Sequence, residues 1–170
     1  TGPLRDTTHG GWYAVVDNDG DTVKDRHKEA YAHAFTALAA ASATAANIPG
    51  ADELLTLAID TIEQHFWSDD EQRCRDDWDE TFTTCDPYRG GNMNMHSVEA
   101  LLAVADATGD AAWRQRAASI ARFVVGLADE HDGRLPEHFD DAWVADLELN
   151  ADRPGDQFKP YGATIGHGFE

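Results

Sequence analysis

Apolar residues recur at intervals of three and four along four stretches of the chain, which is the spacing of an amphipathic α-helix. The predicted helices cover residues 25–46, 52–66, 93–106 and 111–128. On the first of them the apolar stripe consists of Tyr31, Ala34, Phe35, Leu38 and Ala41. Pro49-Gly50 ends this helix, and Thr108-Gly109-Asp110 supplies a stop and an N-cap between the third and fourth. The pattern therefore predicts two helical hairpins.

The segments between these helices are rich in turn-forming residues. Residues 10–16 predict a short strand that enters a tight turn at 17–20. Residues 67–91 predict a long polar loop, residues 134–162 a second irregular segment, and a final helix is expected to begin near Gly166. Long ordered loops are usually functional, and a plain four-helix bundle would not need them. Hairpins with elaborated loops on one side predict an all-α fold, either an α/α toroid or a helical solenoid.

Length and composition limit the class of protein. The 170 residues suffice for one globular domain, and 42% of them are hydrophobic, which argues against wholesale disorder. No apolar run is long enough for a membrane span, and the N-terminus has no signal-peptide pattern. The first residue is Thr1 rather than Met, so we expect the sequence to be a piece of a longer protein.

Charge and cysteine content narrow the choice of partners. The formal net charge is −19. Nucleic acids and anionic membranes attract clustered Lys and Arg, so neither is an expected partner. Cys74 and Cys85 are the two cysteines, and we predict unpaired thiols in a reducing, cytoplasmic compartment. No His and Cys set has metal-ligand spacing and no glycine loop suits phosphate, so we predict no metal site and no phosphate-binding loop.

A polar cluster opens the third predicted helix, with the sequence Gly-Asn-Met-Asn-Met-His at residues 91–96. Asn92 and His96 are four positions apart and therefore project from the same helix face. Asn offers a donor and an acceptor, and neutral His offers one of each, which suits adjacent sugar hydroxyls. The alternative is a capped helix start with an internally hydrogen-bonded histidine.

A second polar cluster lies at the end of the chain, where His167 is expected at the start of the final helix. The positive end of a helix dipole favours a neutral imidazole, which can accept a proton. Glu170, one turn later, could hold that ring or its substrate by a hydrogen bond. A histidine with these properties suits proton transfer at carbon, and simple capping of the helix is the alternative.

Three further groups are polar or amphipathic. Tyr31 lies on the apolar stripe of the first helix, where its hydroxyl can reach a ligand, although a core tyrosine is the commoner outcome. Residues 135–140, Leu-Pro-Glu-His-Phe-Asp, are interpreted as a pocket rim or as a contact that fixes the loop. The acidic run at 76–80 is interpreted as a solvated loop rather than a metal site.

These motifs together resemble the N-acylglucosamine 2-epimerase family, which also includes mannose isomerases, sulfoquinovose isomerases and cellobiose 2-epimerases. The resemblance covers essentially the whole chain, in the family's order and approximate spacing. Its specific elements are the Asn-Met-Asn-Met-His run at 92–96 and the Gly-His pair at 166–167 followed by Glu170. The supporting elements are Lys-Glu-Ala-Tyr at 28–31, Tyr-Arg-Gly at 88–90, residues 135–140 and Pro-Tyr-Gly at 160–162.

The resemblance implies an (α/α)6 barrel, of which residues 1–170 form roughly the central half of the catalytic domain, with the sugar pocket at the mouth of the barrel. It implies that His167 is one of two catalytic histidines and that Glu170 supports it. It also implies that Tyr31, Asn92 and His96 contact the sugar. The second catalytic histidine and a sugar-binding arginine lie outside this chain, which alone could not close a pocket.

The activity implied is cofactor-free interconversion of an aldose and a ketose, of the mannose–fructose type, by proton transfer through an enediol. The expected partner is a monosaccharide, and the resemblance admits a homodimer. Phe169, directly before Glu170, favours the branch of mannose and sulfoquinovose isomerases.

Three alternatives stay open. An N-acylglucosamine or other sugar 2-epimerase would return the proton to the opposite face of C2. A glycoside hydrolase on the same scaffold would need two facing carboxylates, for which Glu137 and Asp140 are candidates. A non-catalytic carbohydrate-binding protein would keep the helical scaffold without the chemistry.

Overall fold

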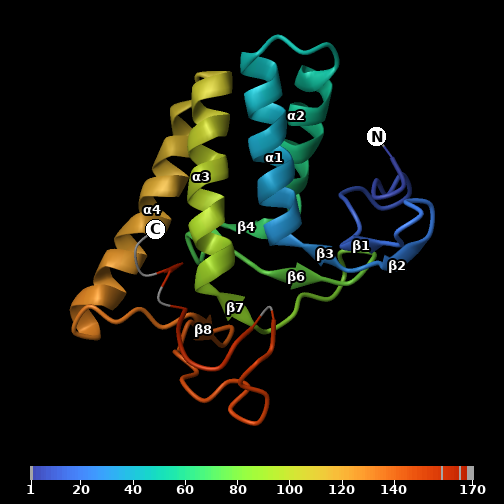
Figure 1. The fold of residues 1–170 in the computed structure, drawn as a ribbon. Helices are drawn as coiled ribbons and strands as arrows, with labels where there is room; N and C mark the ends of the chain where they lie inside the picture. The colour runs from blue at the N-terminus through green and yellow to red at the C-terminus, as the bar shows by residue number, and fades with distance from the viewer. Residues whose placement is uncertain (1, 158, 165, 168–170) are drawn as a thin grey trace.

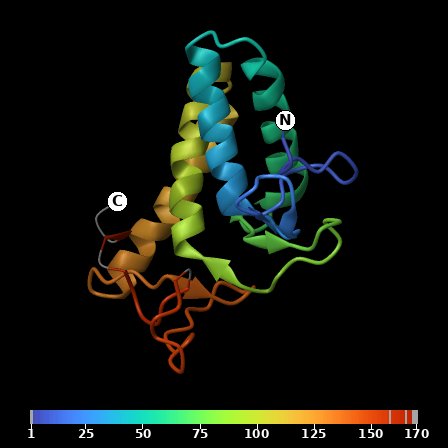
Figure 2. The ribbon, with the colours of Figure 1, turned by 45° about the vertical axis from the view of Figure 1, so that its right-hand side comes forward.

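The computed structural model describes residues 2–157, 159–164 and 166–167, and within them two helical hairpins stand side by side (Figure 1). In chain order the helices are α1 (Ala30–Ala45), α2 (Ala51–Thr61), the π-helix η1 (Ile62–Phe66) that continues it, α3 (Gly91–Thr108) and α4 (Ala111–Glu130). Helices α1 and α3 pack together in the centre, and α2 and α4 flank them (Figures 1 and 2). The two predicted hairpins are therefore confirmed. No helix in this described part of the chain is both long and apolar enough to cross a membrane.

The first helix begins later than predicted, at Ala30 rather than near residue 25. The preceding strand β3 (Lys28–Glu29) pairs antiparallel with β6 (Asp77–Trp78). The backbone N–H of Ala30 then donates to the carbonyl of Asp76 at 2.7 Å. The residues expected in the first helical turn are thus held extended by hydrogen bonds to a distant segment, which local periodicity cannot reveal.

The predicted loop at 67–91 is also more ordered than expected, because it contains four short strands. These are β4 (Trp67–Ser68), β5 (Arg73–Cys74), β6 and β7 (Arg89–Gly90). Strand β4 pairs with β5, and β7 pairs with β8 (His138–Phe139) of the second irregular segment. Strands β1 (Val15–Val16) and β2 (Val23–Asp25) form a hairpin around the turn predicted at 17–20. The strands gather at one end of the helices, as the expected one-sided loops require (Figure 1).

Small side chains fill the interface between the central helices. The buried residues there are Ala34, Ala37 and Ala41 of α1 and Ala100, Leu101 and Val104 of α3. Alanine brings helix axes close together, because the axial separation depends on the size of the side chains at the contact. These small side chains allow α1 and α3 to pack closely.

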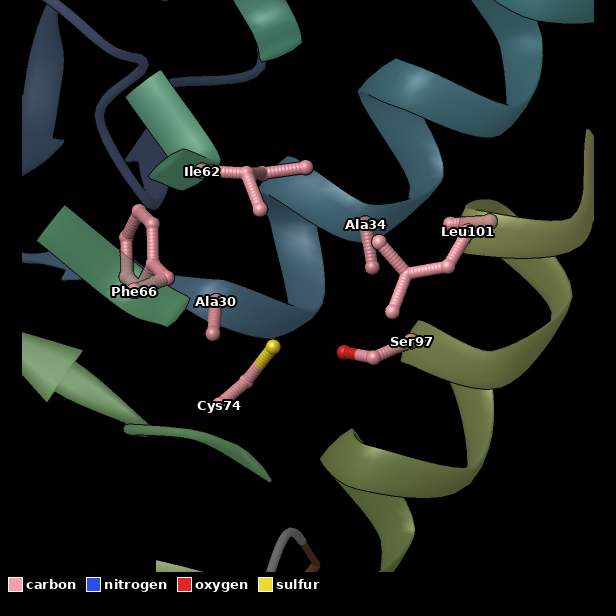
Figure 3. Close-up of a pocket in the computed structure, with 8 residues that line it drawn as sticks. Ala30, Ala34, Ile62, Phe66, Cys74, Ser97 and Leu101 are labelled. Atoms are coloured by element: carbon pink, nitrogen blue, oxygen red, sulfur yellow. The ribbon is translucent and has the colours of Figure 1, made fainter. Parts of the chain in front are cut away.

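One small cavity remains in this core, between α1, η1, β5 and α3 (Figure 3). Its walls include Ala34, Phe66, Cys74 and Ser97, and its volume is about 10 Å³. Sugar-sized ligands need pockets of roughly 300 Å³ or more, so this space is a packing gap and not a substrate site. Cys74 is buried, which raises the pKa of its thiol to about 12, and it is unpaired, as predicted, like Cys85.

A buried ion pair joins the N-terminal segment to the start of α1. Lys28 Nζ donates to Asp6 Oδ2 at 2.7 Å and to the carbonyl of Gly10 at 2.9 Å, and both charged side chains are essentially inaccessible. Burial opposes ionisation of Asp6, but hydrogen bonds from Lys28 and from the backbone of His9 and Thr8 lower the pKa of Asp6. Burial lowers the pKa of Lys28, against the opposing effect of Asp6. No local pattern in the sequence predicts that this lysine is buried.

His33 completes this attachment. Its Nδ1 donates to the carbonyl of Glu29 at 2.7 Å, and its Nε2 accepts from the backbone N–H of Trp12 at 3.0 Å. These two contacts fix one neutral tautomer, and burial lowers the pKa of His33 to about 4. A side chain on Gly11, whose φ is +67°, would place its Cβ 2.6 Å from that Nε2.

Asp76 contradicts the interpretation of residues 76–80 as a solvated loop. Its side chain is buried, and its Oδ2 accepts from the backbone N–H of Gly90 at 2.7 Å. Burial and the neighbouring charge of Asp77 raise the pKa of Asp76 to about 8. The carboxyl therefore fixes β7 just before α3 begins.

Replacement of Lys28 by Met in the full-length protein should cost about 3–5 kcal/mol of unfolding free energy, because it leaves the Asp6 carboxylate buried without its counter-charge. The Asp6 pKa is lowered in the folded state, so this carboxylate stabilises the protein above its unfolded pKa, and the effect is lost as the pH falls. The deficit of Lys28→Met should thus shrink below about pH 4 in urea denaturation. The double variant Lys28→Met with Asp6→Asn should be more stable than Lys28→Met alone, and a deficit under about 1 kcal/mol in the single variant would contradict this.

Replacement of Asp76 by Asn should remove a pH dependence of stability. The folded pKa of Asp76 is raised, so its contribution is present below the unfolded pKa and is lost as the pH rises through about 8. The Asn amide oxygen still accepts from Gly90, so Asp76→Asn should be more stable than the unsubstituted protein at about pH 9 but not at about pH 5. Urea denaturation at both pH values measures this, and parallel curves for the two proteins would show that Asp76 does not titrate as described.

Candidate functional site

The pairing of β7 with β8 brings the second irregular segment to the start of α3. Gly90 lies opposite His138 in this pair. The backbone N–H of Gly91, the first residue of α3, donates to the carbonyl of Glu137 at 2.8 Å. Two polar groups separated in sequence, on α3 and on residues 137–167, are therefore attached to one another by main-chain hydrogen bonds.

The first group lies on the face of α1 and α3 that α2 and α4 leave uncovered. The rings of Tyr31 and Phe35 lie 5.2 and 4.9 Å from the ring of His96, measured between centroids. Tyr31 is 42% exposed and Phe35 is 38% exposed, so the predicted apolar stripe of α1 divides between the core and this open face. Packing of α1 against α2 and α3 selects His33 and the alanines for the core instead.

One ring nitrogen of His96 is engaged by Glu99, and the other can accept a hydrogen bond from a ligand. Its Nδ1 lies 2.8 Å from Glu99 Oε2, and a carboxylate can only accept, so Nδ1 carries the hydrogen. In the neutral ring Nε2 is then an acceptor. The internal hydrogen bond considered as an alternative is thus present, and it orients the ring while leaving its second nitrogen available.

Two asparagines of α3, two positions apart, point to different sides of the helix and have different surroundings. Asn94 is buried, and its amide accepts from the N–H of Cys74 and donates to the carbonyls of Cys74 and Gly90. Asn92 lies on the same helix, and its Oδ1 is buried without a hydrogen-bond partner among the described residues. Buried polar atoms are normally satisfied, so the Asn92 carbonyl is an acceptor available for a ligand.

The second group surrounds Glu137, whose side chain is 7% exposed. Its Oε1 accepts a hydrogen bond from the backbone N–H of Thr164 and lies 3.1 Å from His167 Nδ1. His167 is itself partly exposed, at 28%. Glu170 and most of the helix predicted near Gly166 lie outside the described residues.

His138 ties this second group to β7. Its Nε2 lies 2.7 Å from the carbonyl of Pro160, which can only accept, and its Nδ1 lies 2.8 Å from the hydroxyl of Tyr88. In the neutral ring Nε2 therefore donates and Nδ1 accepts from Tyr88. The interpretation of residues 135–140 as a contact that fixes the loop agrees with this bridge.

Glu71 also fixes the irregular segment 134–162, through Trp143. Hydrophobic periodicity does not predict this role. Its carboxylate accepts from Arg75 Nε at 2.7 Å, from Arg89 Nε at 2.9 Å and from Trp143 Nε1 at 2.9 Å. Burial opposes ionisation, but these three hydrogen bonds lower the pKa of Glu71 to about 2. The guanidinium carbon of Arg73 lies over two neighbouring aromatic rings, 3.9 Å from the ring centroid of Phe123 and 4.3 Å from that of Trp143. An anion and a cation thus hold Trp143 against the helices.

One cluster in the described part of the chain has the composition of a metal site, and it lies at the N-terminal segment. The ligand atoms of Asp6, His9 and Glu80 lie within 4.8 Å of one another. Lys28 already binds Asp6, and Arg26 binds Glu80 at 2.9 Å. Two cations thus neutralise the carboxylates that a metal ion would need, and the cluster does not suit one.

The sequence of this chain is similar to those of D-mannose isomerases. The chain is 52% identical over 170 residues to a D-mannose isomerase from Thermobifida fusca and 45% identical over 172 residues to one from Pseudomonas cannabina pv. alisalensis. These matches cover 99% and 100% of this chain, but the chain spans only 42% and 41% of those relatives.

Solved structures agree with the sequence matches. A crystal structure of D-mannose isomerase has a TM-score of 0.86 at 30% identity, covering 95% of this chain and 41% of that protein. The cellobiose 2-epimerase from Bacillus thermoamylovorans B4167 has a TM-score of 0.76 at 18% identity, which supports the fold alone. Both neighbours are (α/α)6 barrels, so the two hairpins are part of such a barrel, as predicted. The family model for N-acylglucosamine 2-epimerase (GlcNAc 2-epimerase) matches residues 1–170, and the chain belongs to that family.

Proposed function

We propose that the protein containing this chain is a cofactor-free sugar isomerase that interconverts an aldose and a ketose, with mannose and fructose as the expected pair. The observation that carries this proposal is the 52% identity to a D-mannose isomerase over 99% of the chain. In this proposal residues 1–170 form part of the catalytic barrel, and the remaining helices lie in the rest of the protein. Cytoplasmic location, a homodimer and the absence of a metal stay predictions.

The proposed reaction moves one proton between neighbouring carbons. After the sugar ring opens, His167 removes the proton from C2 while the C1 carbonyl oxygen gains a proton, which gives the enediol. The C2 hydroxyl then loses its proton and C1 gains one, which gives the ketose. The second histidine that the family resemblance implies would share these transfers, and Glu170 would support His167.

The face of α1 and α3 is proposed to hold the sugar. Tyr31 offers a hydroxyl, Asn92 a carbonyl without a partner among the described residues, and His96 its Nε2, and all three lie at the starts of the central helices. Polar groups fixed in advance orient the sugar and stabilise the charge that develops on the enediolate oxygens. The aromatic rings of Tyr31 and Phe35 present an apolar surface beside those polar atoms.

The hydrolase alternative is weakened by the surroundings of its two carboxylates. Glu137 is engaged by Thr164 and faces His167. Asp140 accepts from the backbone N–H groups of Ala142 and Val144 at 3.0 and 2.9 Å. Neither carboxylate is arranged as a free acid facing its partner across a substrate. The 2-epimerase alternative differs from the isomerase only in where the proton returns, so the products distinguish them.

Incubation of the full-length protein with mannose in deuterated water should give fructose and deuterium at the exchanging carbon. His167→Ala should lower the rate by about 10²-fold or more, because the ring transfers the proton. The control is His27→Ala, at an exposed histidine of the N-terminal segment, which should keep the full rate. NMR of the sugar measures both exchange and products.

Each other outcome of that experiment has a defined meaning. Exchange at C2 that yields the epimer without ketose would replace the isomerase by a 2-epimerase. Binding of mannose without any exchange would favour a carbohydrate-binding protein. Full activity in His167→Ala would exclude His167 as a group that transfers the proton.

Asn92→Ala and Asn94→Ala form a matched pair for the sugar-binding role. Asn92→Ala should raise KM by about tenfold with little change in thermal stability, because Oδ1 has no partner among the described residues. Asn94→Ala should instead destabilise the fold by about 1–3 kcal/mol, because it leaves buried groups of Cys74 and Gly90 unpaired. Steady-state kinetics and thermal melts separate the two, and an unchanged KM in Asn92→Ala would exclude its contact with the sugar.

A further inference from the structure

The side chain of Glu137 contacts both ends of the short segment that carries His167. Its Oε1 accepts from the backbone N–H of Thr164 and lies 3.1 Å from His167 Nδ1. The backbone N–H of His167 in turn donates to the carbonyl of Thr164 at 3.0 Å. One carboxylate oxygen therefore restrains the backbone before the ring and lies beside the ring itself.

Glu137 is held firmly enough to act as a reference point for that ring. It is buried, and its carbonyl accepts from Gly91 at the start of α3. The next residue, His138, is fixed between Tyr88 and Pro160. The position of the carboxylate is thus set by α3 and by β7, not by the segment that it contacts.

The ring nitrogen that faces Glu137 needs a partner. His167 Nδ1 is buried, and it has no aligned hydrogen bond among the described residues despite its short distance to Oε1. Catalytic hydrogen bonds are often poorly aligned before substrate binds and tighten in the complex. A small rotation of the ring would direct the Nδ1 hydrogen at a carboxylate that can only accept.

We propose that Glu137 is a positioning residue for His167: its carboxylate holds the ring with the hydrogen on Nδ1, so that Nε2 faces the sugar as the base, and it stabilises the imidazolium that forms. The inference rests on the proposed function of His167. A carboxylate beside a proton-accepting histidine selects the tautomer and lowers the energy of the charged ring. Glu137 is a different residue from Glu170, to which the family resemblance gives the supporting role.

The test uses the full-length protein with Glu137→Ala and Glu137→Gln. Glu137→Ala removes both contacts and should lower kcat by about 10- to 100-fold, while KM for mannose changes less than about threefold. Glu137→Gln should retain part of that rate, because its amide oxygen can still accept from Thr164 and from the ring. The control is Glu148→Gln, which removes one charge from an exposed position of the irregular segment 134–162 and should keep the full kcat.

Nitrogen-15 NMR of the histidine rings supplies a readout that a merely structural role would not change. The His167 signals, assigned by their loss in His167→Ala, should show the Nδ1–H tautomer in the unsubstituted protein and a mixture of tautomers in Glu137→Ala. If Glu137→Ala does not fold, Glu137→Gln decides, since it keeps the acceptor for Thr164. A kcat within twofold of the unsubstituted protein with the same ring tautomer would overturn the inference.

Failure of the proposed function has a different signature. In that case the unsubstituted protein exchanges no proton with any sugar. The tautomer of His167 can still be measured, because NMR of the ring does not require activity. A tautomer that is the same in Glu137→Ala and in the unsubstituted protein excludes the positioning role whether or not the protein is an isomerase.

Discussion

The close approach of three segments around Gly90 is the constraint on which the site depends. Gly90 donates to buried Asp76, pairs with His138 across β7 and β8, and directly precedes α3. A Cβ at this position would lie 2.7 Å from Asp76 Oδ1 and 3.1 Å from the hydroxyl of Tyr88. A larger residue at position 90 would separate β7 from Asp76 or from β8, which begins the segment 138–167. The start of α3 and that segment are adjacent because residue 90 has no side chain.

The buried carboxylates Glu71 and Asp6 are paired with donors, whereas two of the five buried side-chain atoms that lack a partner in the described ranges lie where chemistry is proposed. Glu71 has three hydrogen-bond donors, and Asp6 has Lys28 and two backbone groups. These contacts fix the loops, because a buried charge without a partner is strongly destabilising. Buried Asn92 Oδ1 and His167 Nδ1, in contrast, have no aligned partner in the described ranges. Polar atoms left unsatisfied in an otherwise paired environment are candidates for ligand contacts.

The sequence predicted the helices well and the connections poorly, for one physical reason. Helical periodicity depends on neighbours three and four residues away, and both hairpins and the Asp110 N-cap are confirmed. Strand β3 and the burial of Lys28 and Asp76 depend on partners far along the chain, so no local pattern indicates them. The short strands within the predicted loop at 67–91 also pair partly with distant segments, so the local pattern predicts only a polar loop there.

The candidate site likewise contains residues that local spacing predicts and residues that depend on distant contacts. The shared face of Asn92 and His96 follows from their spacing on α3, whereas the exposure of Tyr31 required knowledge of which helices pack against α1. The contact between Glu137 and His167 joins residues thirty positions apart. It could be suspected only from the density of polar residues in the segment 135–140, which indicated a fixed loop but not the group that it fixes.

A crystal structure of the full-length protein with bound mannitol, an open-chain polyol, would test this arrangement most directly. We expect C2 of the polyol within about 3–3.5 Å of His167 Nε2, with Nδ1 on Glu137 and the hydroxyl groups on Asn92 and His96. A polyol bound away from the uncovered face of α1 and α3, or a His167 ring turned away from Glu137 in the complex, would contradict it.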